Sequence, residues 1–328
     1  MKVLFIGGSG IISSACSALA VESGIDLFLL NRGQTSFRPI PAAAHVIHAD
    51  IRDPAAAAEA LRGQTFDAVV DWIAFTPDHV AADLELFRGR VGQFVFISSA
   101  SAYQKPPQRL PITEETPLDN PFWQYSRNKI ACEELLMAAY RDEGFPVTIV
   151  RPSHTYDATL LPFHGGYTTL DRLRRGKPIL IHDDGESLWT LTHHRDFARA
   201  FVPLLGEPRA IGQAYHITSD EVLTWNEIAR LLGEAAGVTP NIIHVPSAVV
   251  AKYDEHFGDS LLGDKSHNTT FDNRKIRSIV PGFAAEIPFA EGAREIVAWY
   301  DAHPEAQRVN AEHDALLDRI IADAVEHG

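Results

Sequence analysis

The sequence predicts an α/β protein in which a doubly wound parallel sheet is followed by a smaller, tightly packed α+β domain. Three observations lead to this prediction. Short apolar runs alternate with helical segments as far as Pro152, a glycine-rich turn follows the first run, and loops and isolated helices take over beyond Pro152. Strands that alternate with helices form βαβ units, whose sheet is parallel and covered on both faces.

The first half of the chain supplies the elements of the large sheet. Its apolar runs are brief and lack helical spacing, which predicts strands at 2–6, 26–30, 45–48, 68–71, 93–98 and 146–151. The segments between them predict helices at 11–22, 53–61, 79–87 and 125–140, with Pro54 just inside the start of the second helix.

The second half has a different rhythm. Loops rich in Pro, Gly and His extend to Gly185, one strand is expected at 214–218, and amphipathic helices are expected at 226–236, at 289–302 and within 304–327. We therefore expect a dinucleotide-binding domain of residues 1–155, to which segments near 186–218 can return, and a substrate domain of residues 156–328.

Composition narrows the class of partner. The 328 residues include 29 basic and 43 acidic side chains, which give a formal charge of −14. An acidic surface repels phosphate backbones and anionic lipids, so we expect a small-molecule partner and neither nucleic acid nor membrane. The two cysteines, Cys16 and Cys132, are too few for a disulfide framework, which favours the cytoplasm. The uncharged stretch 3–21 could be taken for a signal peptide, but its glycines and serines interrupt the apolar segment that such a peptide needs.

The turn after the first strand predicts a dinucleotide site. Glycines there let backbone amides approach a pyrophosphate at the positive end of the following helix. The residues placed to contact the cofactor are Gly7, Ser9, Gly10, Ile11 and Ile12, then Asp50 and Ile51 near the adenine, then Ile73, Ala74 and Phe75 after the fourth strand. Each of these assignments has a purely structural alternative. The glycines can serve only the geometry of the turn, Asp50 can cap the following helix, and Trp72, which precedes Ile73, can be a core residue.

Tyr125 and Lys129 form the sharpest chemical pattern. They are four residues apart at the start of a helix, so both side chains lie on one face. A free tyrosine has a pKa of about 10, and a neighbouring ammonium favours its phenolate form. The pair is therefore predicted to act as a general acid and base.

Together these motifs resemble the extended short-chain dehydrogenase/reductase superfamily, whose members have a Rossmann-type sheet and include NAD-dependent epimerases and dehydratases. The resemblance rests on the glycine turn, Asp50-Ile51, the run from Phe94 to Tyr103, Tyr125-x-x-x-Lys129 and Arg151-Pro152, in family order. It implies that Tyr125 exchanges the substrate proton and that Lys129 bonds the nicotinamide ribose and lowers the Tyr125 pKa. It also implies that Ser99 orients the substrate oxygen, with Ser98 as an alternative and Ser101 less favoured. The sequence departs from the family pattern at Ser13, Gln104 and Asp157, where glycine is usual.

The second strand suggests the cofactor. It ends in Asn31-Arg32, without the acid that would bond the ribose of NAD, and Arg32 is placed to pair with a 2′-phosphate. NADP(H) is therefore favoured, and NAD(H) is the alternative if Arg32 stacks on adenine.

The predicted substrate is sugar-like. His154, Tyr156 and Trp189 are expected to line its pocket together with Ser99, and aromatic faces suit the C–H surfaces of a sugar. The family's nucleotide-binding Asn is absent after Arg151-Pro152, and Trp189 takes the place of an Arg. We therefore expect a substrate without a nucleotide diphosphate, or one that is bound differently from the substrates of the epimerases that this sequence resembles. Arg274 and Lys275 could still supply charge for a diphosphate.

The predicted function is NAD(P)-dependent hydride transfer at a hydroxyl or keto carbon, as in an oxidoreductase or epimerase. The alternatives are a sugar-nucleotide epimerase/dehydratase and a non-catalytic scaffold or RNA-binding protein, the description of a plant relative of this branch. No histidine pair has zinc-ligand spacing with an acid, so no metal site is predicted. The oligomeric state is not fixed by the sequence, and a homodimer is one option.

Overall fold

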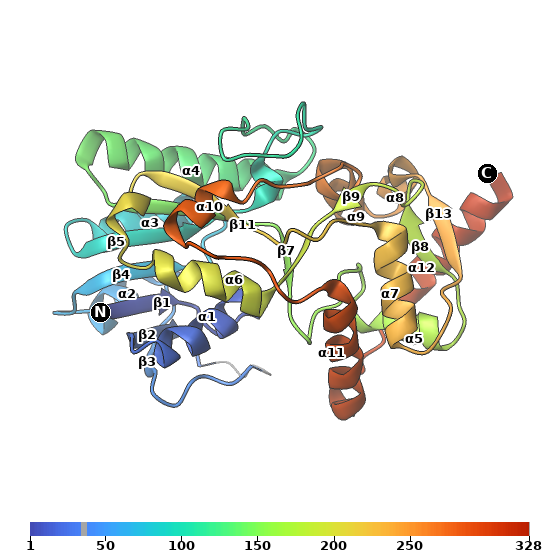
Figure 1. Cartoon of the computed structure of the whole chain (residues 1–328), viewed down its shortest axis with the longest axis horizontal. Helices are drawn as coiled ribbons and strands as arrows, with labels where there is room; N and C mark the ends of the chain where they lie inside the picture. Colours follow the sequence, from blue (N-terminus) through green and yellow to red (C-terminus); the bar gives the residue numbers. More distant parts are fainter. Residues whose placement is uncertain (34–37, 328) are drawn as a thin grey trace.

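The computed structural model describes residues 1–33 and 38–327. Its larger part is a parallel sheet, drawn on the left of Figure 1, and both faces of this sheet carry helices. The strands are β1 (Lys2–Ile6), β2 (Asp26–Asn31), β3 (His45–His48), β4 (Phe66–Asp71), β5 (Val91–Ile97), β6 (Val147–Pro152) and β11 (Gln213–Ile217). The helices are α1 (Ile11–Glu22), α2 (Pro54–Ala60), α3 (Pro77–Phe87), α4 (Gln124–Glu143), α6 (His194–Phe201) and α10 (Arg274–Ile279).

The strand order in the described residues is β11-β6-β5-β4-β1-β2-β3, and every neighbouring pair is parallel. The chain builds the sheet outward from β1 in one direction through β2 and β3, and in the other through β4, β5 and β6. Open α/β sheets bind ligands where this direction reverses, at the carboxyl ends of the strands. The fold therefore predicts a ligand site at the carboxyl ends of β1 and β4.

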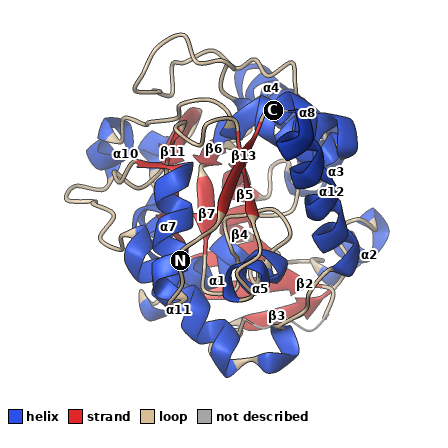
Figure 2. Cartoon of the chain, turned by 90° about the vertical axis from the view of Figure 1, so that its right-hand side faces the viewer, coloured by secondary structure: helices blue, strands red, loops and turns tan. Residues whose placement is uncertain are grey.

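Successive side chains of each strand point to opposite faces of the sheet, so the sheet has a hydrophobic core on each face. Val3 and Phe5 of β1 point to the side of α1 and α6, whereas Leu4 and Ile6 point to the side of α3 and α4. All four side chains are fully buried. Figure 2 shows α3 and α4 on one side of the strands.

The smaller part, on the right of Figure 1, combines short strands and helices. Its strands pair in twos as β7 with β10, β9 with β12, and β8 with β13: β7 (His154–Tyr156), β8 (Ile179–His182), β9 (Leu188–Trp189), β10 (Leu191–His193), β12 (Leu223–Thr224) and β13 (Ile242–Val245). Its helices are α5 (Tyr167–Arg174), α7 (Trp225–Ala235), α8 (Ser247–Tyr253), α9 (Glu255–Ser260), α11 (Phe289–Ala302) and α12 (Ala311–His327). A π-helical turn spans Leu261–Lys265.

The second half holds more regular structure than the sequence predicts. The expected loop before Gly185 contains α5 and β8, and the single predicted strand is one of several. That strand, β11, joins the large sheet beside β6, so the chain returns to the first part after leaving it. No helix in the described part of the chain is long and apolar enough to cross a membrane.

Candidate active site

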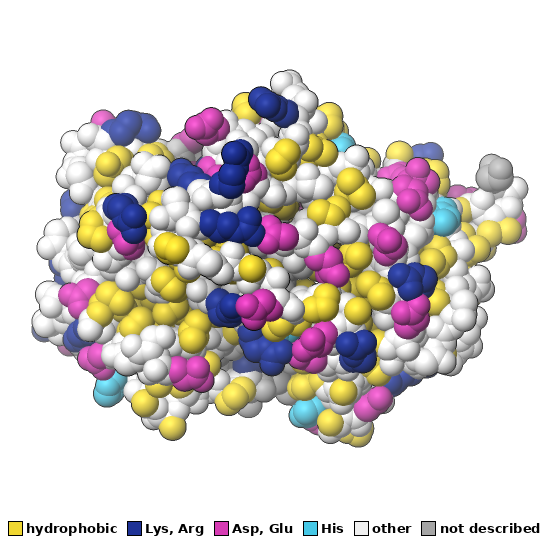
Figure 3. Space-filling view, viewed as in Figure 1, with side chains coloured by type: hydrophobic (Ala, Val, Ile, Leu, Met, Phe, Trp, Pro, Cys, Tyr) yellow, Lys and Arg dark blue, Asp and Glu magenta, His cyan; other side chains and the backbone are white. Residues whose placement is uncertain are grey.

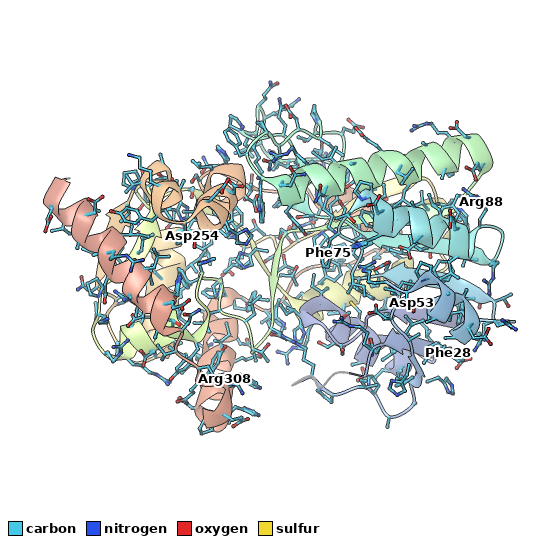
Figure 4. All side chains as sticks on the ribbon, turned by 180° about the vertical axis from the view of Figure 1, so that it is seen from behind. Phe28, Asp53, Phe75, Arg88, Asp254 and Arg308 are labelled. Atoms are coloured by element: carbon cyan, nitrogen blue, oxygen red, sulfur yellow. The ribbon has the colours of Figure 1, made fainter. Side chains whose placement is uncertain are left out.

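A cleft of about 580 Å³ lies at the carboxyl ends of the sheet strands. It is lined by nearly all of the predicted cofactor residues: Gly7, Ser9, Gly10, Ile11, Ile12, Asn31, Arg32, Asp50, Ile51, Ile73, Phe75, Ser98, Tyr125 and Lys129. Ala74 does not line the cleft, because it is fully buried and only its carbonyl meets Lys129. Phe75 is 45% exposed, and Figure 4 shows it near the middle of the molecule. An open aromatic face at this position can cover a flat ring.

The turn after β1 has the geometry of a phosphate cradle. Gly7 and Gly8 have φ values of 100° and 101°, which favour glycine. A Cβ on Gly8 would lie 2.6 Å from Leu29 Cδ2, so no side chain fits there. Ser13, the departure from the family pattern, accepts a hydrogen bond from the Gly10 N–H at 2.8 Å and so steadies the turn. First-turn amides of α1 have no partner within the helix and remain available to a pyrophosphate.

The structural alternatives for Asp50 and Trp72 have different outcomes. Asp53, not Asp50, caps α2, because its carboxylate accepts from the Ala56 N–H at 3.0 Å. Asp50 accepts from the Arg52 N–H and faces the cleft. Trp72 packs in the core against Phe5 and Phe201, with ring centroids 5.4 Å and 4.8 Å apart, while its edge reaches the cleft.

Tyr125 lies where this cleft meets a second cavity of about 190 Å³, which we call the outer chamber. The outer chamber is lined by Ser99, Tyr125, His154, Trp189, Asp264 and Lys265, among others. Tyr125 makes a side-chain hydrogen bond with Ser99, and the Ser99 Oγ is 2.9 Å from the Ser101 Oγ. Ser98 instead faces the cofactor cleft, where its buried hydroxyl has no hydrogen-bond partner among the described residues.

Lys129 is held at the floor of the cleft by two backbone carbonyls. Its Nζ donates to the Ala74 oxygen at 2.6 Å and to the Ile97 oxygen at 2.8 Å. It also lies 5.8 Å from the centroid of the Tyr125 ring. An ammonium has three protons, so one donor remains for a third partner.

The lowering of the Tyr125 pKa by Lys129, which the resemblance implies, stays a prediction. Burial raises the pKa of Tyr125 to about 12, and the Ser99 hydrogen bond lowers it only in part. Burial also lowers the pKa of Lys129 to about 8. Tyr125 is therefore protonated at neutral pH, which suits proton donation to a developing alkoxide.

A third cavity of about 190 Å³, the inner chamber, adjoins the outer one and shares His154 and Lys265 with it. Its other walls include Phe163, Trp225 and Phe257. The Nδ1 of His154 accepts from the Trp189 indole N–H at 3.2 Å, and burial lowers the His154 pKa to about 3, so this imidazole is neutral and its Nε2 carries the proton.

Tyr156 does not line the substrate pocket, contrary to the prediction. Its ring is fully buried against His193 and Phe289, at centroid distances of 5.3 Å and 5.4 Å. Its hydroxyl lies over Gly292, where a Cβ would be 2.1 Å away. Packing from α11 therefore takes Tyr156 into the core of the second part.

Other pocket residues were not foreseen. Asp264 and Lys265 belong to the π-helical turn, and no sequence pattern marks them. Trp225 is 2% exposed and its indole N–H has no acceptor among the described residues. Arg274 and Lys275, the predicted alternative cations, line neither chamber. Within residues 1–33 and 38–327, no three His, Cys, Asp or Glu side chains converge as a metal site would require.

The cleft brings the glycine turn together with Tyr125 and Lys129, the motifs on which the resemblance to short-chain dehydrogenases/reductases rests. The model of the "NAD dependent epimerase/dehydratase family" matches residues 3–218, and the chain belongs to this family. Its relatives are named epimerases, dehydratases and reductases.

Two curated relatives show the range of the family. The chain is 28% identical over 288 residues to 2′-dehydrokanamycin reductase of Streptomyces kanamyceticus, covering 86% of this chain and 80% of the relative. It is 26% identical over 261 residues to chloroplast stem-loop binding protein of 41 kDa b of Arabidopsis thaliana, covering 74% of this chain and 65% of the relative.

Solved structures share the fold. An epimerase from Methanothermobacter thermautotrophicus superposes with a TM-score of 0.77 at 17% identity, over 94% of each chain. UDP-glucose 4-epimerase from Bifidobacterium longum, in complex with NAD⁺ and UDP, gives 0.75 at 19% identity, over 93% of this chain and 100% of that one.

Proposed function

We propose that the protein is an NAD(P)-dependent oxidoreductase or epimerase that transfers a hydride to or from a hydroxyl or keto carbon of a sugar-like substrate. The observation that carries the proposal is the convergence of Tyr125, Ser99 and Lys129 between the cofactor cleft and the outer chamber. Residues 1–155 form the cofactor domain, to which α6 and β11 return from the segment near 186–218, and the rest of residues 156–328 forms the substrate domain. The buried free thiols of Cys16 and Cys132 support a cytoplasmic location.

Each side chain has a separate task. The nicotinamide, when bound, exchanges a hydride with the substrate carbon. Ser99 donates a hydrogen bond to the oxygen on that carbon and orients it. Tyr125 transfers its Oη proton to this oxygen in the reducing direction and takes it back in the oxidising direction. Lys129 is anchored by the Ala74 and Ile97 carbonyls and would have its third N–H left to bind the ribose of the cofactor.

The chambers favour a substrate without a nucleotide diphosphate. Among the described residues that line them, Lys265 is the only Lys or Arg, whereas a diphosphate calls for paired cations. Each chamber is slightly larger than a cavity of about 150 Å³ that holds benzene, so each accepts one six-membered ring. The His154 Nε2–H belongs to a residue that lines both chambers, and such a donor suits the oxygens of a glycoside. The kanamycin-related relative supports a glycoside substrate, and the UDP-bound neighbour supports the alternative of a sugar nucleotide.

A substrate screen tests this proposal. Free sugars, glycosides and sugar nucleotides are offered with each nicotinamide cofactor, and the absorbance of the reduced nicotinamide is followed. We expect turnover of a glycoside or free sugar, and we expect UDP not to compete with it at micromolar concentration. Competition by UDP at that level would establish the sugar-nucleotide alternative instead.

Cofactor preference is the next prediction. Arg32 lines the cleft after β2, and this strand ends in Asn31 and not in an acid. We expect tighter binding of NADP(H) than of NAD(H), and Arg32→Ala should weaken NADP(H) by about tenfold to a hundredfold, the loss of one charge-assisted contact. Fluorescence titration of both cofactors measures this, with the exposed Arg62→Ala as control. A preference for NAD(H) that Arg32→Ala leaves unchanged would refute the assignment.

An RNA-binding role is the second candidate, and its support is the chloroplast relative. On the face drawn in Figure 3, Lys and Arg side chains are interspersed with Asp and Glu and form no continuous basic patch. With a formal charge of −14, this surface opposes a phosphate backbone. The gathered Tyr125, Ser99 and Lys129 also favour the enzyme.

A further inference from the structure

Two buried carboxyl groups face each other beneath the cofactor cleft. Asp71 ends β4 and is fully buried, and Asp83 lies on α3 with 1% exposure. Both oxygens of Asp83 and the Oδ2 of Asp71 are buried without a hydrogen-bond donor among the described residues, and the two carboxyl groups are close enough for one to donate to the other when it carries a proton. A hydrogen bond between two carboxyl groups requires a proton on one of them. Burial and the neighbouring Asp71 raise the pKa of Asp83, which favours its protonated form.

The other oxygen of Asp71 shapes the cleft. Its Oδ1 accepts from the Ile73 N–H at 2.6 Å and from the Ala74 N–H at 2.8 Å, which fixes the backbone just after β4. The carbonyl of Ala74 in turn accepts from Lys129 Nζ at 2.6 Å. A continuous chain of hydrogen bonds and one short backbone segment therefore joins Asp83 to the lysine of the candidate site.

The charges around this chain are few. Arg52 approaches from the loop after β3, His79 lies on α3, and Cys132 and Glu133 lie on α4. Burial lowers the Lys129 pKa and Arg52 adds to this effect, while Cys132, Asp71 and Glu133, in that order, oppose it. Asp71 therefore helps to keep Lys129 charged.

We propose that Asp71 and Asp83 are positioning residues that share one proton, hold the backbone carbonyl that anchors Lys129, and supply the negative charge that keeps this lysine an ammonium. The protonated Asp83 carboxyl donates a hydrogen bond to Asp71, so that Asp71 can stay ionised although it is buried away from water. The inference deepens the proposed function, because it concerns the same lysine. Its test, however, needs no substrate.

The first experiment measures the titration of Lys129 directly. The protein is labelled with ¹³Cε-lysine, and the Lys129 resonance is assigned from its absence in Lys129→Met. We expect a midpoint near pH 8 in the wild type and the same midpoint in Asp83→Asn, since the amide still donates to Asp71. The double variant Asp71→Asn/Asp83→Asn has no charge at the pair, and its Lys129 midpoint should fall. The double variant is needed because in Asp71→Asn alone the charge can pass to Asp83.

The second experiment measures the shared proton through stability. The Asp83 pKa is raised by burial and by Asp71, so above the unfolded value of about 3.9 the unfolded chain releases a proton that the folded chain keeps. The folded state is therefore destabilised as pH rises, by up to about tenfold in the unfolding equilibrium constant per pH unit. Asp83→Asn removes this dependence, so its stability relative to the wild type should grow from about pH 5 to about pH 7 in urea unfolding.

Each arm can overturn one half of the proposal. A constant stability difference between Asp83→Asn and the wild type would exclude the shared proton, and this arm needs only the single variant to fold. An unchanged Lys129 midpoint in the double variant, or a shifted one in Asp83→Asn, would exclude the positioning role. A protein that passes both arms but turns over no sugar would contradict the proposed function and leave the acid pair established.

Discussion

Replacing Tyr125 by Phe should reduce turnover of the identified substrate by about 10²-fold to 10⁴-fold, the usual contribution of a positioned acid or base. The ring stays in place and only the hydroxyl is lost, so cofactor affinity should change little. The pKa of about 12 means that this hydroxyl carries its proton at neutral pH, and its removal takes away the hydrogen-bond partner of Ser99 on Tyr125. Steady-state kinetics at saturating cofactor measures the effect.

A matched control lies on the same helix. Tyr140 is part of α4 but lines none of the three cavities, so Tyr140→Phe makes the same chemical change away from the site. We expect its turnover to equal that of the wild type. Thermal unfolding should show both variants folded, since losing the single hydrogen bond to Ser99 costs about 1 kcal/mol. Undiminished turnover in Tyr125→Phe would remove Tyr125 from the chemistry.

The large sheet could be predicted because patterns among neighbouring residues mark each of its strands and helices. Each strand of the first half is a short apolar run between glycine, proline or polar turns, and α1 begins and ends where its spacing predicts, at Ile11 and Glu22. Most strands of the second half could not be predicted, because they depend on contacts between distant parts of the chain. The strands of this half are two to five residues long and gain stability only from partners far along the chain, as β8 does from β13. Such runs are too short to show a period.

Some residues of the candidate site could also be predicted from local patterns, and others could not. The glycine turn and the Tyr125 to Lys129 spacing are local patterns with a chemical reason, and the structure brings them to one cleft. Tyr156 was misplaced because its environment is set by Gly292 on α11, and no local pattern connects the two. Asp264 and Lys265 reach the outer chamber only through the fold of a π-helical turn.

Asp71 illustrates a further limit. The sequence places it at the end of β4, but its role depends on Asp83, which occupies the buried face of α3 beside apolar residues. A carboxyl group in an apolar helix face is a visible anomaly, because an isolated buried charge is costly. Only the structure shows that its partner is another acid.

Replacing Lys129 by Met should lower turnover by about 10²-fold to 10³-fold and should also weaken cofactor binding, unlike Tyr125→Phe. The variant removes the N–H groups that the Ala74 and Ile97 carbonyls accept, at a cost of about 1–3 kcal/mol for unsatisfied buried acceptors, while it relieves the burial of a charge. We therefore expect a folded protein.

The pH profile of Lys129→Met distinguishes a charged lysine from a merely structural one. The Lys129 pKa is lowered to about 8, so wild-type turnover should fall as pH rises through that value and the ammonium loses its proton. The residual turnover of Lys129→Met has no such group and should stay flat across the same range. The exposed Lys252→Met, at the end of α8, serves as control and should retain the wild-type profile. A decline near pH 8 that persists in Lys129→Met would assign that limb to another group and leave Lys129 with only a packing role.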